Sequence, residues 1–127
     1  MNKWIRELEI KTPSAEAPAQ SLSGGNQQRV VLAKWLATGP KVFILDGPTI
    51  GVDIASKSNI HNIVRELAGR GMGIIIISDE IPEVLQNCNR VFIMRRGKII
   101  HEAKDVTAVT EDDIFSIMSG KEANEAV

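Results

Sequence analysis

Two short aliphatic runs constrain the fold of this chain more than any other feature. Residues 41–45 read KVFIL, and residues 73–78 read GIIIIS. Continuous apolar runs bounded by turn-forming residues are typical of strands buried in a parallel sheet. Between them, residues 54–69 carry apolar side chains at the spacing of an amphipathic helix. This strand–helix–strand order predicts the α/β fold class, with βαβ units around parallel strands.

Further helices and a hairpin are predicted on either side of this unit. Residues 12–20 hold two prolines and several small residues, and we expect a linker there. The sequence Arg95-Arg96-Gly97 predicts a tight turn between two strands. The other helices are expected over residues 3–10, 26–36, 81–88 and 105–120, and the hairpin strands over residues 90–94 and 98–101.

The helix predicted over residues 26–36 has an apolar and a polar side. Leu32, Trp35 and Leu36 lie at positions i, i+3 and i+4, so they are predicted to face the core. We interpret Trp35, like Trp4, as a packing residue. The polar side chains expected to face solvent are Gln28, Arg29 and Lys34.

Composition argues against several classes of protein. The 127 residues suffice for one small domain, and the apolar fraction of 43% argues against disorder throughout. A formal net charge of −1 argues against a nucleic-acid partner, because such proteins carry a basic excess that neutralises phosphates. Cys88 is the single cysteine, so a reducing, cytoplasmic setting is expected. We expect neither a signal peptide nor a membrane-spanning helix.

Residues 22–28 form the motif with the clearest chemistry, LSGGNQQ. Glycines let a backbone approach a ligand closely, and the serine adds a hydroxyl group. The N-terminus of the helix that follows offers free N–H groups and the positive end of a dipole, which favour an anion. Ser23-Gly24-Gly25 alone would also suit a capped turn without a ligand. The candidate binding residues are Leu22, Ser23, Gly24, Gly25, Asn26, Gln27 and Gln28.

The whole heptad resembles the signature loop of ATP-binding cassette ATPases, and its Asn-Gln-Gln ending resembles the branch that imports ribose-, galactose- or xylose-type sugars. Residues 42–46 look like the Walker B strand of this family, and Gly51-Val52-Asp53 looks like its D-loop. The resemblance runs from about Ile10 to Glu102. It implies the C-terminal part of a nucleotide-binding domain: a truncated P-loop NTPase-type layer with helices on parallel strands and a C-terminal β-hairpin.

The resemblance also implies cofactors and partners. ATP would be bound between this chain and another cassette, and Asp46 would hold Mg²⁺ through water at the end of its strand. Further implied partners are a membrane permease and a sugar-binding protein, with the chain in the cytoplasm, peripheral to the inner membrane. A homo-oligomer is an alternative assembly.

Three features depart from the family pattern. No stretch of the 127 residues matches the P-loop pattern G-x-x-x-x-G-K-[ST], so we expect the chain to begin in mid-domain. Gly47 stands where the family has a glutamate that polarises the attacking water, and general-base help worth about 10²–10⁴ in rate would be missing. Asp79 stands where most cassettes have the switch histidine, and its charge would repel phosphates. We therefore assign no catalytic residue and predict that the isolated chain does not hydrolyse ATP.

These features leave three hypotheses for the function. The first is a fragment of the ATP-binding subunit of a sugar importer, which contributes its signature loop to an ATP site completed by another cassette. The second is a non-catalytic interaction or regulatory module, and the third is an inert relic of a truncated cassette. The predicted division is a helix and linker over residues 1–20, the cassette segment over 21–104, and a helix and tail over 105–127. Without the P-loop strand, an edge or face of the sheet is expected to lie exposed.

Overall fold

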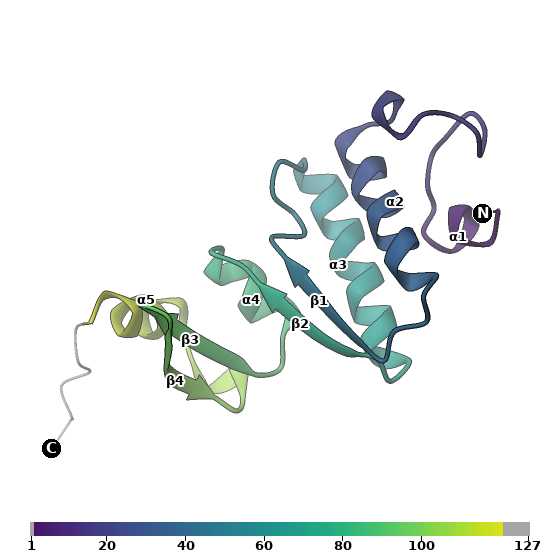
Figure 1. The fold of residues 1–127 in the computed structure, drawn as a ribbon. Helices are drawn as coiled ribbons and strands as arrows, with labels where there is room; N and C mark the ends of the chain where they lie inside the picture. Colours follow the sequence, from purple (N-terminus) through teal and green to yellow (C-terminus); the bar gives the residue numbers. More distant parts are fainter. Residues whose placement is uncertain (1, 121–127) are drawn as a thin grey trace, which may run out of the picture. The chain divides into compact units, whose positions relative to one another are not determined.

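The computed structural model describes residues 2–120. The chain divides into two compact units, Met1–Ile77 and Ser78–Val127. Helices and a parallel strand pair make up the first unit, and the second contains an antiparallel hairpin (Figure 1). This mixture confirms the α/β fold class.

The first unit is built around two parallel strands. β1 (Val42–Asp46) pairs with β2 (Gly73–Ile77), with Val42 opposite Gly73 and Asp46 opposite Ile77. α3 (Ile54–Gly69) connects the two strands, so they form the predicted βαβ unit. The remaining elements of this unit are α1 (Asn2–Glu7), the 3-10 helix η1 (Ala19–Ser21) and α2 (Gly24–Leu36).

The core of this unit lies between the helices and one face of the strands. Phe43 and Leu45 of β1 are buried against side chains of α2 and α3, among them Leu32 and Ile60. The opposite face is exposed: Ile44 keeps 61% of its surface. The expectation of buried strands is therefore confirmed for one face of β1 and wrong for the other. The expectation of an exposed face or edge is confirmed.

The buried side of α2 agrees with the prediction at Leu32 and Leu36, which are buried, and differs from it at Arg29 and Trp35. Arg29 is buried, with 6% of its surface exposed, whereas Trp35 is 52% exposed and has the Lys34 ammonium 5.2 Å from its ring centroid. Arg29 lies in line with Leu32 and Leu36 on the core side of the helix. Its guanidinium donates from Nη1 to the backbone oxygen of Glu9 at 2.5 Å, and this bond offsets part of the cost of burying the charge; the buried Nε has no acceptor within residues 2–120.

The second unit packs two helices on a hairpin. β3 (Val91–Arg95) and β4 (Lys98–Ala103) are antiparallel, as predicted. Arg96 and Gly97 both have positive φ, at 50° and 74°, which is typical of a two-residue type I′ turn. The helices of this unit are α4 (Ile81–Asn87), the 3-10 helix η2 (Val106–Ala108) and α5 (Glu111–Ser119).

The prediction of one continuous helix over residues 105–120 is wrong, because the segment forms two separate helices. The segment splits into η2 and α5, because Thr110 starts α5 with a capping box: its hydroxyl accepts from the Asp113 N–H, and the Asp113 carboxylate accepts from the Thr110 N–H. Gly120 ends α5 with φ 74°. Within residues 2–120, no helix combines the length and the apolar character needed to cross a bilayer.

Candidate nucleotide-contact site

Ser23 caps the N-terminus of α2 in the centre of the LSGGNQQ motif. Its backbone is extended, and its Oγ accepts from the Asn26 N–H at 3.4 Å and from Asn26 Nδ2 at 3.0 Å. This cap uses one of the N–H groups that every helix leaves free at its start. The backbone N–H groups of Gly24 and Gly25 have no acceptor within residues 2–120. The start of α2 therefore has the free donors that an anion requires.

Two amide side chains fix the shape of this loop. Asn26 accepts from the Lys11 N–H at 2.9 Å through Oδ1, while its Nδ2 donates to Ser23. Gln27 donates from Nε2 to the Leu22 oxygen at 2.8 Å. The sequence alone did not indicate that Asn26 connects the segment around Lys11 to the signature loop.

The two glycines of the motif have different surroundings. A Cβ on Gly25 would lie 2.4 Å from Ser56 Oγ, so a glycine is needed there for packing against α3. A Cβ on Gly24 would meet only the Gly51 oxygen, at an ordinary 3.8 Å. Gly24 is exposed, whereas Gly25 is buried. The glycine at position 25 is therefore explained by packing as well as by the predicted approach of a ligand.

The predicted D-loop, Gly51-Val52-Asp53, lies beside the predicted signature loop. Ser56 lies between them: it packs against Gly25 and its N–H donates to Asp53. Asp53 caps α3, and its carboxylate accepts from the Ser56 N–H at 3.0 Å. Hydrogen bonds from the Ser56 backbone and side chain hold the pKa of Asp53 below its usual range. Gly51 has φ 72°, which lets the chain turn between Thr49 and Val52. Ser56, which lies next to both Gly25 and Asp53, was not among the residues predicted from the sequence.

Asp46 lies exposed at the carboxyl end of β1. Gly47 follows with φ 55°, and its N–H donates to the Ile77 oxygen at 2.9 Å, so the ends of the two strands are joined here. No group of three potential metal ligands occurs within residues 2–120. A single carboxylate nevertheless fits Mg²⁺, which keeps several waters and binds through one or two carboxylates together with phosphates.

Asp79 belongs to the second unit. It lies in the turn before α4, where the Ser78 hydroxyl donates to the buried Glu83 carboxylate and accepts from the Glu80 N–H at 3.1 Å. The first unit thus holds the predicted signature loop, the predicted D-loop and Asp46, and the two loops lie next to each other. Asp79 is placed only within its own unit.

Several known proteins are similar to this chain. A profile of the ABC transporter family matches residues 1–50. The ribose import ATP-binding protein RbsA of Rhodococcus jostii is 44% identical over 121 residues, which are 95% of this chain and 24% of that protein. RbsA of Bacillus subtilis is 46% identical over 91% of this chain and 23% of its own length. The chain therefore spans about a quarter of these relatives.

Solved structures match the fold. A nucleotide-free ATP-binding cassette from an ABC transporter superimposes with a TM-score of 0.78 at 28% identity, over 98% of this chain and 47% of that one. The dimeric cassette MJ0796, in a post-hydrolysis state bound to ADP and Pi, gives 0.71 at 25% identity, over 81% of this chain and 44% of that one. The chain is thus similar to part of one ATP-binding cassette of an ABC transporter.

Proposed function

We propose that this chain contributes its signature loop to an ATP site whose remaining groups come from another cassette, in the ATP-binding subunit of a sugar importer. The observation that carries the proposal is the start of α2, where the N–H groups of Gly24 and Gly25 are free and Ser23 presents a hydroxyl. Such a helix start binds the phosphates of ATP through hydrogen bonds and the helix dipole. The dimeric state of MJ0796, bound to ADP and Pi, supports a second cassette as the partner.

The chain's own groups assist binding rather than hydrolysis in this proposal. Asp46 would orient Mg²⁺ through water, and Mg²⁺ supplies charge neutralisation at the phosphates. Gly47 offers no acceptor for a proton of the attacking water. This feature favours the non-catalytic module as the second candidate function. A membrane permease, a sugar-binding protein and a place at the cytoplasmic face of the membrane belong to the same proposal.

The substitution Ser23→Arg tests the proposal in the full 127-residue chain. Binding to a P-loop-bearing cassette, purified from the Bacillus subtilis relative, is measured in the presence of Mg-ATP and of Mg-ADP. We expect an ATP-dependent complex that weakens at least about tenfold with Ser23→Arg, because the bulky side chain covers the start of α2.

Ser119→Arg is the matched control, because Ser119 is exposed on α5 in the second unit. It should bind like the wild type. Equal binding by the Ser23 variant, or a complex that forms equally well with ADP, would contradict the proposal.

A further inference from the structure

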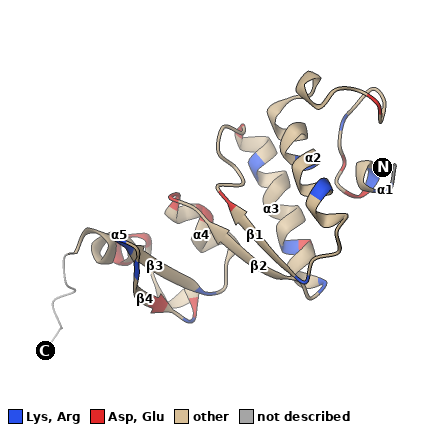
Figure 2. Ribbon diagram, in the orientation of Figure 1, with Lys and Arg blue, Asp and Glu red and all other residues tan. Residues whose placement is uncertain are grey.

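The β3–β4 hairpin ends in a tip, residues 94–99, that is both basic and apolar. The stretch from residue 90 to residue 101, RVFIMRRGKIIH, contains four Arg or Lys residues and no Asp or Glu, although the whole chain has a formal net charge of −1. Three of these cations, Arg95, Arg96 and Lys98, lie at the turn itself. Figure 2 shows blue where β3 turns into β4. The tip therefore concentrates positive charge in a chain that is slightly acidic as a whole.

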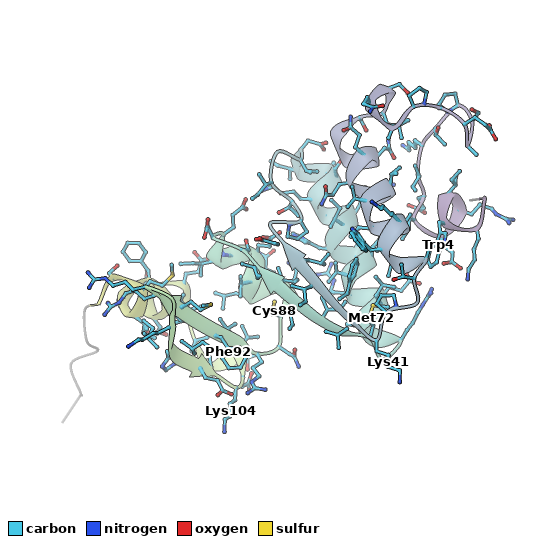
Figure 3. All side chains as sticks on the ribbon, viewed as in Figure 1. Trp4, Lys41, Met72, Cys88, Phe92 and Lys104 are labelled. Atoms are coloured by element: carbon cyan, nitrogen blue, oxygen red, sulfur yellow. The ribbon has the colours of Figure 1, made fainter. Side chains whose placement is uncertain are left out.

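The three cations of the tip have no carboxylate partner within residues 2–120. Arg90, just before β3, differs from them: its guanidinium pairs with Glu102 at 2.6 Å and lies 4.7 Å from the ring centroid of Phe92, which Figure 3 labels on the hairpin. Arg95 lies next to Gly120 at the end of α5, where the helix dipole favours a cation. The fold thus holds positive charge at the tip without neutralising it.

Two large apolar side chains flank the same turn. Met94 and Ile99 are cross-strand neighbours, so they share one face of the hairpin, and they are 62% and 60% exposed. Val91 and Ile93 lie on the other face, where they are buried against side chains of α4 and α5. Met94 and Ile99 therefore extend on the face that these helices do not cover, next to the cations.

This combination distinguishes between anionic partners. A free phosphate would use the cations and gain nothing from Met94 and Ile99. Single-stranded nucleic acid is bound by cations together with aromatic side chains that stack on the bases, and residues 94–99 contain no aromatic residue. A bilayer with anionic phospholipids offers negative headgroups to cations and an acyl boundary to aliphatic side chains. The tip matches the bilayer in both respects.

We propose that the tip of the β3–β4 hairpin binds the surface of an anionic phospholipid bilayer. Its three cations lie at the lipid phosphates, and Met94 and Ile99 enter the boundary between headgroups and acyl chains. Each cation near such a surface raises the affinity about fivefold, so three raise it roughly a hundredfold. The tip lies in Ser78–Val127 and the predicted signature loop in Met1–Ile77, so this inference stands or falls separately from the proposed function.

Co-sedimentation of the full 127-residue chain with lipid vesicles tests the inference. Vesicles of phosphatidylglycerol and phosphatidylcholine in equal parts are compared with vesicles of phosphatidylcholine alone. We expect at least about tenfold tighter binding to the anionic vesicles, and a steady loss of that binding as salt is added, because salt screens the attraction between the tip and the headgroups.

Arg96→Asp combined with Lys98→Glu tests the cations. Asp-Gly is favoured in a type I′ turn, so the hairpin should form, and circular dichroism checks that it does. Binding to anionic vesicles should weaken at least about tenfold. The matched control is Lys34→Glu combined with Lys41→Glu, which changes the net charge of the chain by the same amount at exposed residues of the first unit. The control should change binding less than about twofold.

Met94→Ser combined with Ile99→Ser tests the apolar part of the tip and should weaken vesicle binding at least about threefold. Equal binding to anionic and neutral vesicles would overturn the inference, and so would equal losses in the Arg96–Lys98 variant and its control. Unchanged binding by the serine variant, together with full competition by inorganic phosphate or a single-stranded oligonucleotide, would mean a soluble anion instead of a bilayer. Ser23→Arg should leave vesicle binding intact, which distinguishes a failure here from a failure of the signature-loop proposal.

Discussion

Gly24 and Gly25 follow one another in the sequence, yet their surroundings give them different roles. The position of a Cβ on Gly25, 2.4 Å from Ser56 Oγ, makes that glycine a requirement of packing between α2 and α3. Gly24 has room for a methyl group, so its lack of a side chain leaves the helix start open. The sequence motif identified both positions, but only the fold shows that Gly25 is also needed for packing, because Ser56 is distant in sequence.

Alanine substitutions at these two positions should therefore have opposite effects. Gly25→Ala should lower the free energy of unfolding by about 1–3 kcal/mol through overpacking against Ser56. Gly24→Ala should be neutral or stabilising by up to about 1 kcal/mol, because alanine favours a helix. Urea unfolding of both variants measures the difference. Equal losses at the two positions would contradict the assigned packing role.

Asp53 should make part of the stability of the first unit dependent on pH. Its pKa is lowered in the folded chain by hydrogen bonds from Ser56, so the ionised form is favoured by folding. This contribution is complete above the pKa of the unfolded chain and is lost as the pH falls through the lower pKa of the folded chain. Unfolding measured from neutral to acid pH should show a smaller acid loss for Asp53→Ala than for the wild type. An identical pH dependence would exclude this role.

Helix α2 illustrates how far patterns predict an element. Its existence and its end at Leu36 follow from the apolar spacing and from Gly39-Pro40. The bounds of α3 were predicted as residues 54–69 from its apolar spacing and from the glycines that close it, and the structure adds the cap by Asp53. The burial of Arg29 did not follow, because its partner, the Glu9 oxygen, lies twenty residues away. Trp35 was assigned to the core, but the core side of α2 is centred on Arg29, Leu32 and Leu36.

The role of Arg29 in joining α2 to the N-terminal segment can be measured directly. Glu9 has a positive φ of 49°, and its oxygen accepts from Arg29 Nη1. Arg29→Ala should cost about 1.5–3 kcal/mol, because it removes a charge-assisted hydrogen bond and buried packing. Lys34→Ala on the exposed side of the same helix should stay within about 0.5 kcal/mol. Chemical unfolding of both variants provides the comparison, and similar costs would contradict it.

The two compact units of the chain hold different parts of the predicted nucleotide machinery. The signature loop, D-loop and Asp46 all lie within Met1–Ile77, whereas Asp79 lies in Ser78–Val127. The α/β class, the parallel pair and the hairpin were predicted, since they follow from local patterns of apolar residues and turns. The open face of β1 and β2 was expected only in general terms, because which face lies open depends on tertiary packing. The division of the sequence at residues 20 and 104 stays a prediction.

Calorimetry with Mg-ATP tests most directly whether the chain acts through a site shared with another cassette. The account predicts no saturable binding to the 127-residue chain alone. It also predicts tighter ATP binding by a P-loop-bearing cassette when this chain is present, because Ser23 and the start of α2 then add donors to the phosphates. Saturable, Mg-dependent binding of ATP to the chain alone would contradict the account, since the chain would then hold a phosphate site of its own.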